Sequence, residues 1–163
     1  MTTTGIVGGR WRATITEWGA IEPWDGSPSI DWYVAADDRW HRPREEATRR
    51  QSRVAGTPVV ETRVRIPGGD AVQRVYSVAD GGGLTIVEVA NESNLPIAVA
   101  FTGGHSLLSP RPPTTVPAQG IDLPDDTVIF PVAHHTSIVV ARGHTDSVRT
   151  LPAALATAEQ VSR

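Results

Sequence analysis

The sequence predicts a mainly β protein, an antiparallel β-sandwich followed by a short C-terminal helix. Two observations lead to this prediction. From residue 59 onward, apolar and polar residues alternate with a period of two, as they do along strands with one dry and one wet face. Clusters of glycine and proline interrupt the alternation, and no helical pattern separates one apolar run from the next, which argues against a parallel βαβ sheet. The 163 residues suffice for one domain with a sizeable core.

Upstream of residue 59 the sequence predicts two strands and one charged segment. Residues 10–18 (RWRATITEW) alternate like a strand, and residues 28–36 (PSIDWYVAA) predict a second one. The segment 34–53 contains six arginines and four acids. We expect it to be irregular, with one helical turn at 44–51 (REEATRRQ), where acids precede arginines by four residues.

Downstream, the β pattern is regular. The turn formers PGGD and DGGG separate apolar runs, and the two runs around DGGG predict a hairpin. Residues 103–126 are rich in proline and glycine and predict a long loop, with a short edge strand near Leu107 or Thr115. The predicted strands lie at 59–66, 71–79, 84–90, 97–102, 127–134 and 136–142.

The tail at 151–163 (LPAALATAEQVSR) is the part that resembles a helix. Alanines are frequent in it, Pro152 suits a first helical turn, and Leu155 and Val161 can share one face. We therefore expect a β-sandwich domain over 1–150 and a helical linker over 151–163, which leads toward a domain that this chain does not contain.

Composition excludes several classes of function. The net charge of −3 gives no general attraction to nucleic acid, and no apolar run approaches 18 residues, so neither a nucleic-acid partner nor a membrane is expected. The chain has no cysteine, and all 15 basic residues are arginine, which excludes thiolate and Schiff-base lysine chemistry. No signal peptide is apparent. We expect a cytoplasmic protein without a cofactor.

The segment 69–101 (GDAVQRVYSVADGGGLTIVEVANESNLPIAVAF) joins a strand pair to a further strand through a polar turn, in which Asn91 and Ser93 can bond their own backbone and Pro96 ends the turn. Together with DDRWHRPREE at 37–46 and VIFPVAHHTSIVVA at 128–141, it resembles the N-terminal β-sandwich domain of actinobacterial glycoside-hydrolase-like proteins, such as glucoamylases and glycogen-debranching-like proteins. The resemblance covers roughly residues 30–140.

This resemblance implies a supersandwich-like fold that packs against a helical-toroid catalytic domain. In such families the catalytic carboxylates lie on the helical domain, so no catalytic residue is transferred to this chain. The implied function is a non-catalytic domain of a carbohydrate-active protein that shapes the entrance of its catalytic domain and contacts an oligosaccharide.

All five tryptophans lie within the first 40 residues. Sugar rings stack on flat indole faces, so the candidate carbohydrate-binding residues are Trp24, Trp32 and Trp40. The alternative is that these rings fill a core or cover an interface to a missing domain. Trp24, among proline, aspartate and glycine, is the best candidate for an exposed ring.

Two other readings remain open. The chain can be a free-standing interaction module that forms a homodimer or caps a partner subunit through exposed strand edges. It can also be a small metal-binding β-barrel enzyme, if either His134 or His135 joins His144 across a hairpin. The acid pairs Asp37–Asp38, Glu45–Glu46 and Asp125–Asp126 are expected in solvated turns, and the arginines of 39–53 in a salt-bridged surface or an interdomain contact.

Overall fold

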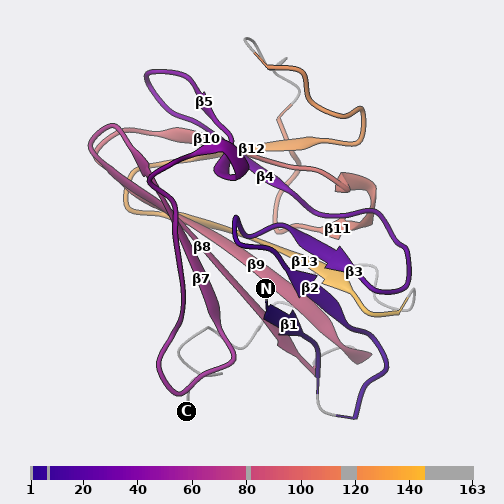
Figure 1. Cartoon of the computed structure of the whole chain (residues 1–163). Helices are drawn as coiled ribbons and strands as arrows, with labels where there is room; N and C mark the ends of the chain where they lie inside the picture. Colours follow the sequence, from indigo (N-terminus) through magenta and orange to yellow (C-terminus); the bar gives the residue numbers. More distant parts are fainter. Residues whose placement is uncertain (1, 7, 80–81, 115–120, 146–163) are drawn as a thin grey trace.

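A computed structural model of the chain describes residues 2–6, 8–79, 82–114 and 121–145. In these ranges the protein is mainly β, with thirteen strands in three antiparallel sheets (Figure 1). The predicted fold class, an antiparallel β-sandwich, is confirmed. The predicted C-terminal helix and the linker at 151–163 lie outside the described residues. Among the described residues, no helix has the length and apolar character needed to cross a membrane.

The largest sheet has six strands in the order β11-β13-β9-β8-β7-β6. The hairpin predicted around DGGG is confirmed, because β8 and β9 pair along their length, from Asp70 opposite Glu92 to Val78 opposite Leu84. The predicted edge strand near Leu107 is also present as β11. The bounds are β6 Arg50–Arg53, β7 Val60–Ile66, β8 Gly69–Val78, β9 Leu84–Glu92, β11 Leu107–Leu108 and β13 Ser137–Gly143.

The other two sheets cover one face of the six-stranded sheet. One has the order β12-β10-β4-β5, formed by β12 Val128–Val132, β10 Ile97–Phe101, β4 Trp32–Ala35 and β5 Trp40–His41. The other consists of β1 Thr2–Thr4, β2 Ala13–Ile15 and β3 Ile21–Pro23. Ile21 and Ile30 pair across a bridge that joins β3 to the segment entering β4.

The charged segment differs from its prediction. A 3₁₀ turn, η1, occupies Pro43–Glu45, and the backbone is extended again from Arg50, where β6 begins. The spacing of acids and arginines favoured a helical turn over 44–51, but β6 pairs with β7 over its whole length. The ladder hydrogen bonds to β7 outweigh the small stabilisation that surface i,i+4 charge pairs supply. Another 3₁₀ turn, η3, lies at Gly104–Ser106.

The main core is a cluster to which all three sheets contribute. Trp32, Phe101 and Phe130 are among its largest fully buried side chains, and the two phenylalanine rings lie 6.2 Å apart. A second buried cluster includes Tyr76 and Ile86. Because side chains alternate along a strand, these two face away from Val75 and Val87 of the main core. The six-stranded sheet is therefore apolar on one face and partly apolar on the other.

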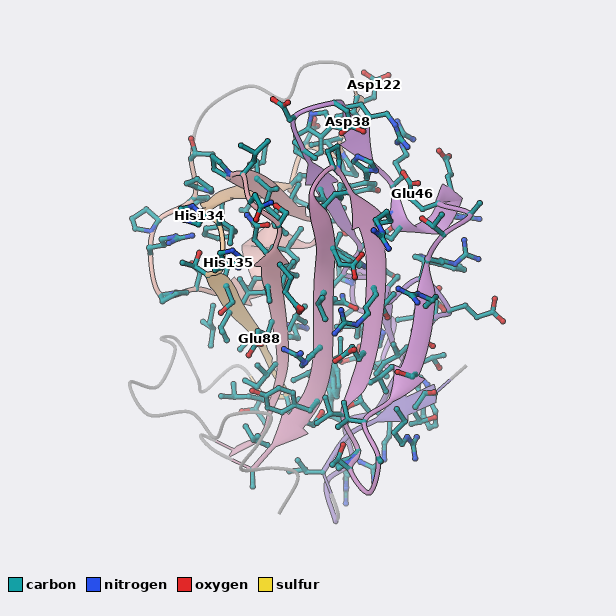
Figure 2. The ribbon with its side chains drawn as sticks, turned by 90° about the vertical axis from the view of Figure 1, so that its left-hand side faces the viewer. Asp38, Glu46, Glu88, Asp122, His134 and His135 are labelled. Atoms are coloured by element: carbon teal, nitrogen blue, oxygen red, sulfur yellow. The ribbon has the colours of Figure 1, made fainter. Side chains whose placement is uncertain are left out.

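The remainder of that outer face is charged. Glu61 accepts from Arg63 at 2.8 Å and from Arg74 at 3.0 Å, and Arg74 reaches Glu88 on β9 at 3.1 Å. Glu88 is labelled on this face in Figure 2. These cross-strand pairs neutralise one another, so this part of the sheet is a solvated structural surface.

Candidate functional site

The structure places the three candidate tryptophans in three environments. Trp32 is 0% exposed, and its indole Nε1 donates to the carbonyl oxygen of Trp18 at 2.8 Å. Its ring is part of the main core and has no open face on which a sugar can stack. Trp40 is half-buried in β5, opposite Ala35 of β4. A sugar-binding role for Trp40 stays a prediction, whereas Trp32 is a core residue here.

Trp24 is 63% exposed, the most exposed large hydrophobic side chain in the described part of the chain. Its indole Nε1 donates to Thr14 Oγ1 at 2.9 Å, and its backbone N–H donates to the Arg12 carbonyl at 2.9 Å. The loop that follows is closed by Asp25, which accepts hydrogen bonds from the hydroxyl and the backbone N–H of Ser27. These bonds lower the pKa of Asp25. The ring of Trp24 is thus open to solvent but fixed in orientation.

At the other end of the β2–β3 hairpin, a five-residue turn at 16–20 is held by three distant side chains. Gln51 donates to the Thr16 carbonyl at 2.7 Å, Trp32 donates to the Trp18 carbonyl, and Gln73 donates to the Gly19 carbonyl at 2.9 Å. The three donors come from β6, β4 and β8. The turn is therefore anchored at three of its carbonyls.

Gly19 is required in this turn. Its φ is +85°, in the left-handed region, and a Cβ at this position would lie 2.1 Å from Gln73 Oε1. Any side chain therefore meets both backbone strain and a buried amide.

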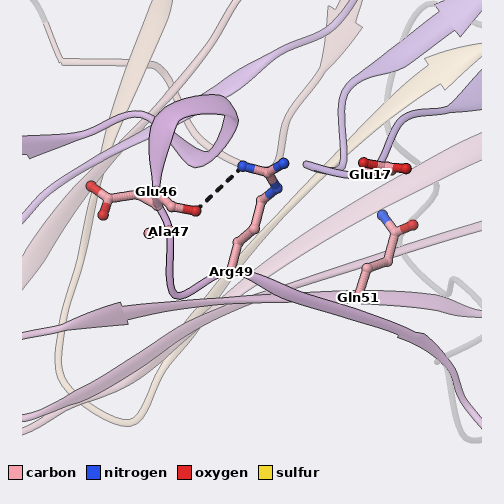
Figure 3. Close-up of a pocket in the computed structure, with 5 residues that line it drawn as sticks. All are labelled: Glu17, Glu46, Ala47, Arg49 and Gln51. Carbon is pink, nitrogen blue, oxygen red and sulfur yellow. Dashed lines mark hydrogen bonds between the residues drawn. The ribbon is translucent and has the colours of Figure 1, made fainter.

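The turn forms one wall of a polar pocket of about 450 Å³. The other walls come from the segment between η1 and β6 and from Gln51 on β6 (Figure 3). Its lining residues are Glu17, Glu46, Ala47, Arg49 and Gln51.

Arg49 is anchored in the pocket wall. Its Nη1 donates to the carbonyl oxygens of Arg44 at 2.8 Å, Glu46 at 3.3 Å and Pro43 at 3.4 Å. The guanidinium therefore closes the η1 turn from inside, and Figure 3 shows it lying between Glu46 and Glu17. Arg44 itself lies over the ring of Trp18, with its guanidinium carbon 5.2 Å from the ring centre.

Glu46 belongs to a network around His41, which is 3% exposed. His41 Nδ1 lies 3.0 Å from Glu46 Oε1, His41 Nε2 lies 2.8 Å from Asp38 Oδ1, and Arg39 donates to Glu46 at 2.8 Å. Burial acts to raise the pKa of Glu46, but the hydrogen bond from Arg39 and the contact with His41 outweigh it and hold that pKa below its usual value. The pKa of Asp38 is lowered in the same way, since its bond to His41 outweighs burial.

Glu17 differs from the other pocket residues. It is exposed, and it makes no hydrogen bond or ion pair with any residue that the structure describes. The pocket therefore combines one free carboxylate with side chains that are already held in place.

The topology of the sheets excludes the metal site in which His134 or His135 joins His144 across a hairpin. His134 and His135 are exposed neighbours on the turn between β12 and β13, with ring centres 5.5 Å apart (Figure 2). These two strands belong to different sheets, so they form no hairpin. His144 follows the far end of β13, whose seven residues span about 20 Å. The three imidazoles do not converge, and the described residues contain no group of three or more acids and histidines suited to a metal ion.

His144 has a different environment. Its ring stacks on Trp11 with centres 4.3 Å apart and planes 10° apart, and its Nε2 lies 2.9 Å from Thr85 Oγ1. Burial, with smaller contributions from the charges of Arg12 and Arg142, lowers the pKa of His144 to about 4. The imidazole is therefore neutral at physiological pH.

Two features of the site had no signal in the sequence. The acids Asp38 and Glu46 were expected in solvated turns, but both contact His41 because the segment between them folds back through η1. The pocket combines Glu17 with residues about thirty positions later, and the β6–β7 pairing, the bond from Gln51 to the turn and the contact of Arg44 with Trp18 bring them together.

The fold and the site define a β-sandwich protein with an exposed, anchored tryptophan and a preorganised polar pocket. Comparison of the chain with models of protein families, with curated proteins and with solved structures finds no match.

Proposed function

We propose that this chain is a non-catalytic β-sandwich domain of a carbohydrate-active, glycoside-hydrolase-like protein. In this role it packs against a helical catalytic domain and contacts an oligosaccharide through Trp24. The observation that carries the sugar contact is the combination of exposure and anchoring at Trp24, whose ring is 63% exposed while its N–H is bound to Thr14.

This combination suits stacking against a sugar. The C–H face of a pyranose packs on an indole ring, and the contact is stronger when the ring needs no reordering on binding. The hydrogen bond to Thr14 and the closed loop at Asp25 limit the conformations of Trp24 before any ligand arrives. Trp40 is half-buried and offers a smaller contact area.

The family resemblance supports the assignment of the domain. The segment 69–101, which carries the resemblance, corresponds to β8, β9 and β10. Its polar turn has a clear structural role. Asn91, 0% exposed, donates to the carbonyls of Leu95 at 2.7 Å and Val132 at 3.1 Å, and accepts from Ser93. Asn91 thus ties the β9–β10 turn to β12 of the four-stranded sheet. This contact gives a physical reason for an asparagine at this position of the segment.

One edge of the largest sheet argues against the alternative, an interaction module that pairs through a strand edge. The edge strand β6 carries Arg50, Ser52 and Arg53 as exposed side chains. Charges on an edge strand oppose pairing with another chain.

The sugar contact is tested by titrating tryptophan fluorescence with maltooligosaccharides. The unmodified protein is expected to show a saturable shift. Because both Trp24 variants lack the reporting indole, their binding is measured by calorimetric titration with the same ligands, in which Trp24→Ala should abolish binding and Trp24→Phe should weaken it, since phenylalanine keeps a smaller stacking face. Trp40→Phe is the matched control and should leave the shift largely unchanged. An unchanged titration in Trp24→Ala, or no shift in the unmodified protein, refutes this contact.

The domain assignment has a separate test, the gene sequence after the codon for Arg163. We expect the reading frame to continue into a long helical segment that carries paired carboxylates. A stop codon at this point would instead favour the interaction module.

A further inference from the structure

We propose that the pocket formed by Glu17, Glu46, Ala47, Arg49 and Gln51 is a binding site for an uncharged, polyhydroxylated ligand, a sugar unit. This inference goes beyond the proposed function, because it concerns a different set of residues and stands whether or not Trp24 contacts sugar.

The first argument is preorganisation. The turn that carries Glu17 is held by hydrogen bonds from Gln51, Trp32 and Gln73. Arg49 is held by three backbone carbonyls, and Glu46 by Arg39 and His41. A ligand that enters this pocket orders few groups on binding, which removes a large part of the usual entropic cost.

The second argument is that several polar atoms of the pocket have no hydrogen-bond partner among the described residues. The Glu17 carboxylate has no partner among the described residues. Arg49 uses only Nη1 within the described structure, so Nη2 and Nε remain as donors. Gln51 donates through Nε2 to Thr16 and Thr62, and its side-chain oxygen accepts no hydrogen bond from the described residues. The pocket therefore presents acceptors and donors together.

The third argument is charge. The charge of Glu46 is balanced by Arg39, and Glu17 stands opposite Arg49. An anion that approaches Arg49 is opposed by Glu17, and a cation that approaches Glu17 is opposed by Arg49. A hydroxyl group is repelled by neither side chain, because it is uncharged and can donate to a carboxylate and accept from a guanidinium. Neighbouring hydroxyls on a sugar ring match such a mixed set.

The test is isothermal titration of the full chain with maltotriose, and with glucose 6-phosphate as an anionic probe and free arginine as a cationic one. Maltotriose is expected to bind more tightly than either charged probe. Glu17→Ala removes the free carboxylate without breaking any described contact, and it should weaken maltotriose binding about tenfold, the effect of one charged hydrogen bond.

The matched control is Asp37→Ala. Asp37 is an exposed acid between β4 and β5, and it does not line the pocket. Its removal changes the net charge by the same amount and should leave binding unchanged. An equal loss in both variants would show a general charge effect and would overturn the pocket assignment, as would tighter binding of either charged probe.

The same titrations on Trp24→Ala separate the two proposals. If Glu17→Ala weakens binding and Trp24→Ala does not, the pocket stands and the Trp24 contact falls. If only Trp24→Ala weakens binding, the pocket assignment is overturned and the proposed function stands. Absence of maltotriose binding in the unmodified chain overturns the pocket assignment.

Discussion

The turn at 16–20 and the stack of Trp11 on His144 both lie against the six-stranded sheet, but they are held by different contacts. Each has buried side-chain atoms without a hydrogen-bond partner among the described residues, and at the turn these are Trp18 Nε1 and Gln73 Oε1. In the turn, three backbone carbonyls accept hydrogen bonds from distant side chains. In the stack, Trp11 Nε1 and His144 Nδ1 are buried without a hydrogen-bond partner among the described residues, and so is the nearby Arg142 Nε.

The difference shows where the molecule is rigid and where it responds to pH. The geometry of the turn depends on amide and indole groups, which do not titrate near neutral pH. The stack depends on an imidazole that must stay neutral, because burial and two nearby arginines oppose its protonation. The turn forms one wall of the candidate pocket, so that wall should keep its shape over a pH range in which the stack weakens.

The strongest way to break the turn is Gly19→Ala. The new Cβ meets Gln73 Oε1 at 2.1 Å in a backbone conformation that alanine rarely adopts, and we expect a loss of about 3 kcal/mol or more in the free energy of unfolding. Denaturant unfolding measures it. Gly26→Ala is the control, since Gly26 has a similar φ of +83° but no atom within 4 Å of its Cβ position. That variant should lose about 1 kcal/mol from backbone strain alone. Equal losses in both would show that Gln73 does not restrict the turn.

The contribution of the Trp11–His144 stack to stability is tested by lowering the pH. Its imidazole has a lower pKa in the folded chain than the unperturbed value of about 6.5, so the unfolded chain binds more protons between pH 6.5 and about 4. Stability from His144 is therefore fully present above pH 6.5 and is lost as pH falls toward 4. We expect this loss to be on the order of 2 kcal/mol, reduced from the full conversion because solvent reaches part of the ring.

The measurement is the free energy of unfolding as a function of pH, compared between the unmodified chain and His144→Phe. Phenylalanine can keep the stack on Trp11 but does not titrate, so its curve should be flatter between pH 6.5 and 4. Parallel curves would mean that His144 is not the group responsible.

A smaller effect is expected from Gln51→Ala. This change removes one of the three side-chain bonds to the turn, which should cost about 1 kcal/mol, while the Thr16 carbonyl keeps the hydrogen bond from the Gly19 N–H at 3.0 Å. Hydrogen exchange is expected to accelerate at the amides of the turn but not at the Trp11–His144 stack. Arg53→Ala, an exposed change on the same strand, should have an effect below about 0.5 kcal/mol. Uniform acceleration across the chain would show that the turn has no separate stability.

The sequence was sufficient for the strands whose two faces differ in polarity. The run at 59–66 alternates because Val60, Thr62 and Val64 are buried while the residues between them are charged, and it is β7 in the structure. Strand β6 has no such alternation, because as an edge strand it exposes arginine on both sides of Gln51. Its charge spacing therefore predicted a helix.

The alternation of apolar and polar residues also does not specify which sheet a strand joins. The pattern at 128–142 shows two strands, but nothing in it shows that the chain crosses from one sheet to another between them. The same limit applies to the tryptophans. The regular spacing of Trp24, Trp32 and Trp40 carries no information on burial, since a half-buried strand and an exposed loop both accept tryptophan. The pocket required contacts between distant segments and was not predicted.

The place of β13 in the six-stranded sheet has a consequence for synthesis of the protein. It is the last described strand in the chain, yet it lies between β9 and β11 and pairs with β9 over its full length. While a ribosome is still translating the residues before 137, the edge of β9 that later pairs with β13 is open. The sequence of β9 is rich in apolar residues. Such an edge attracts other unfinished chains. We therefore expect the nascent β9 edge to be open to such contacts until β13 emerges.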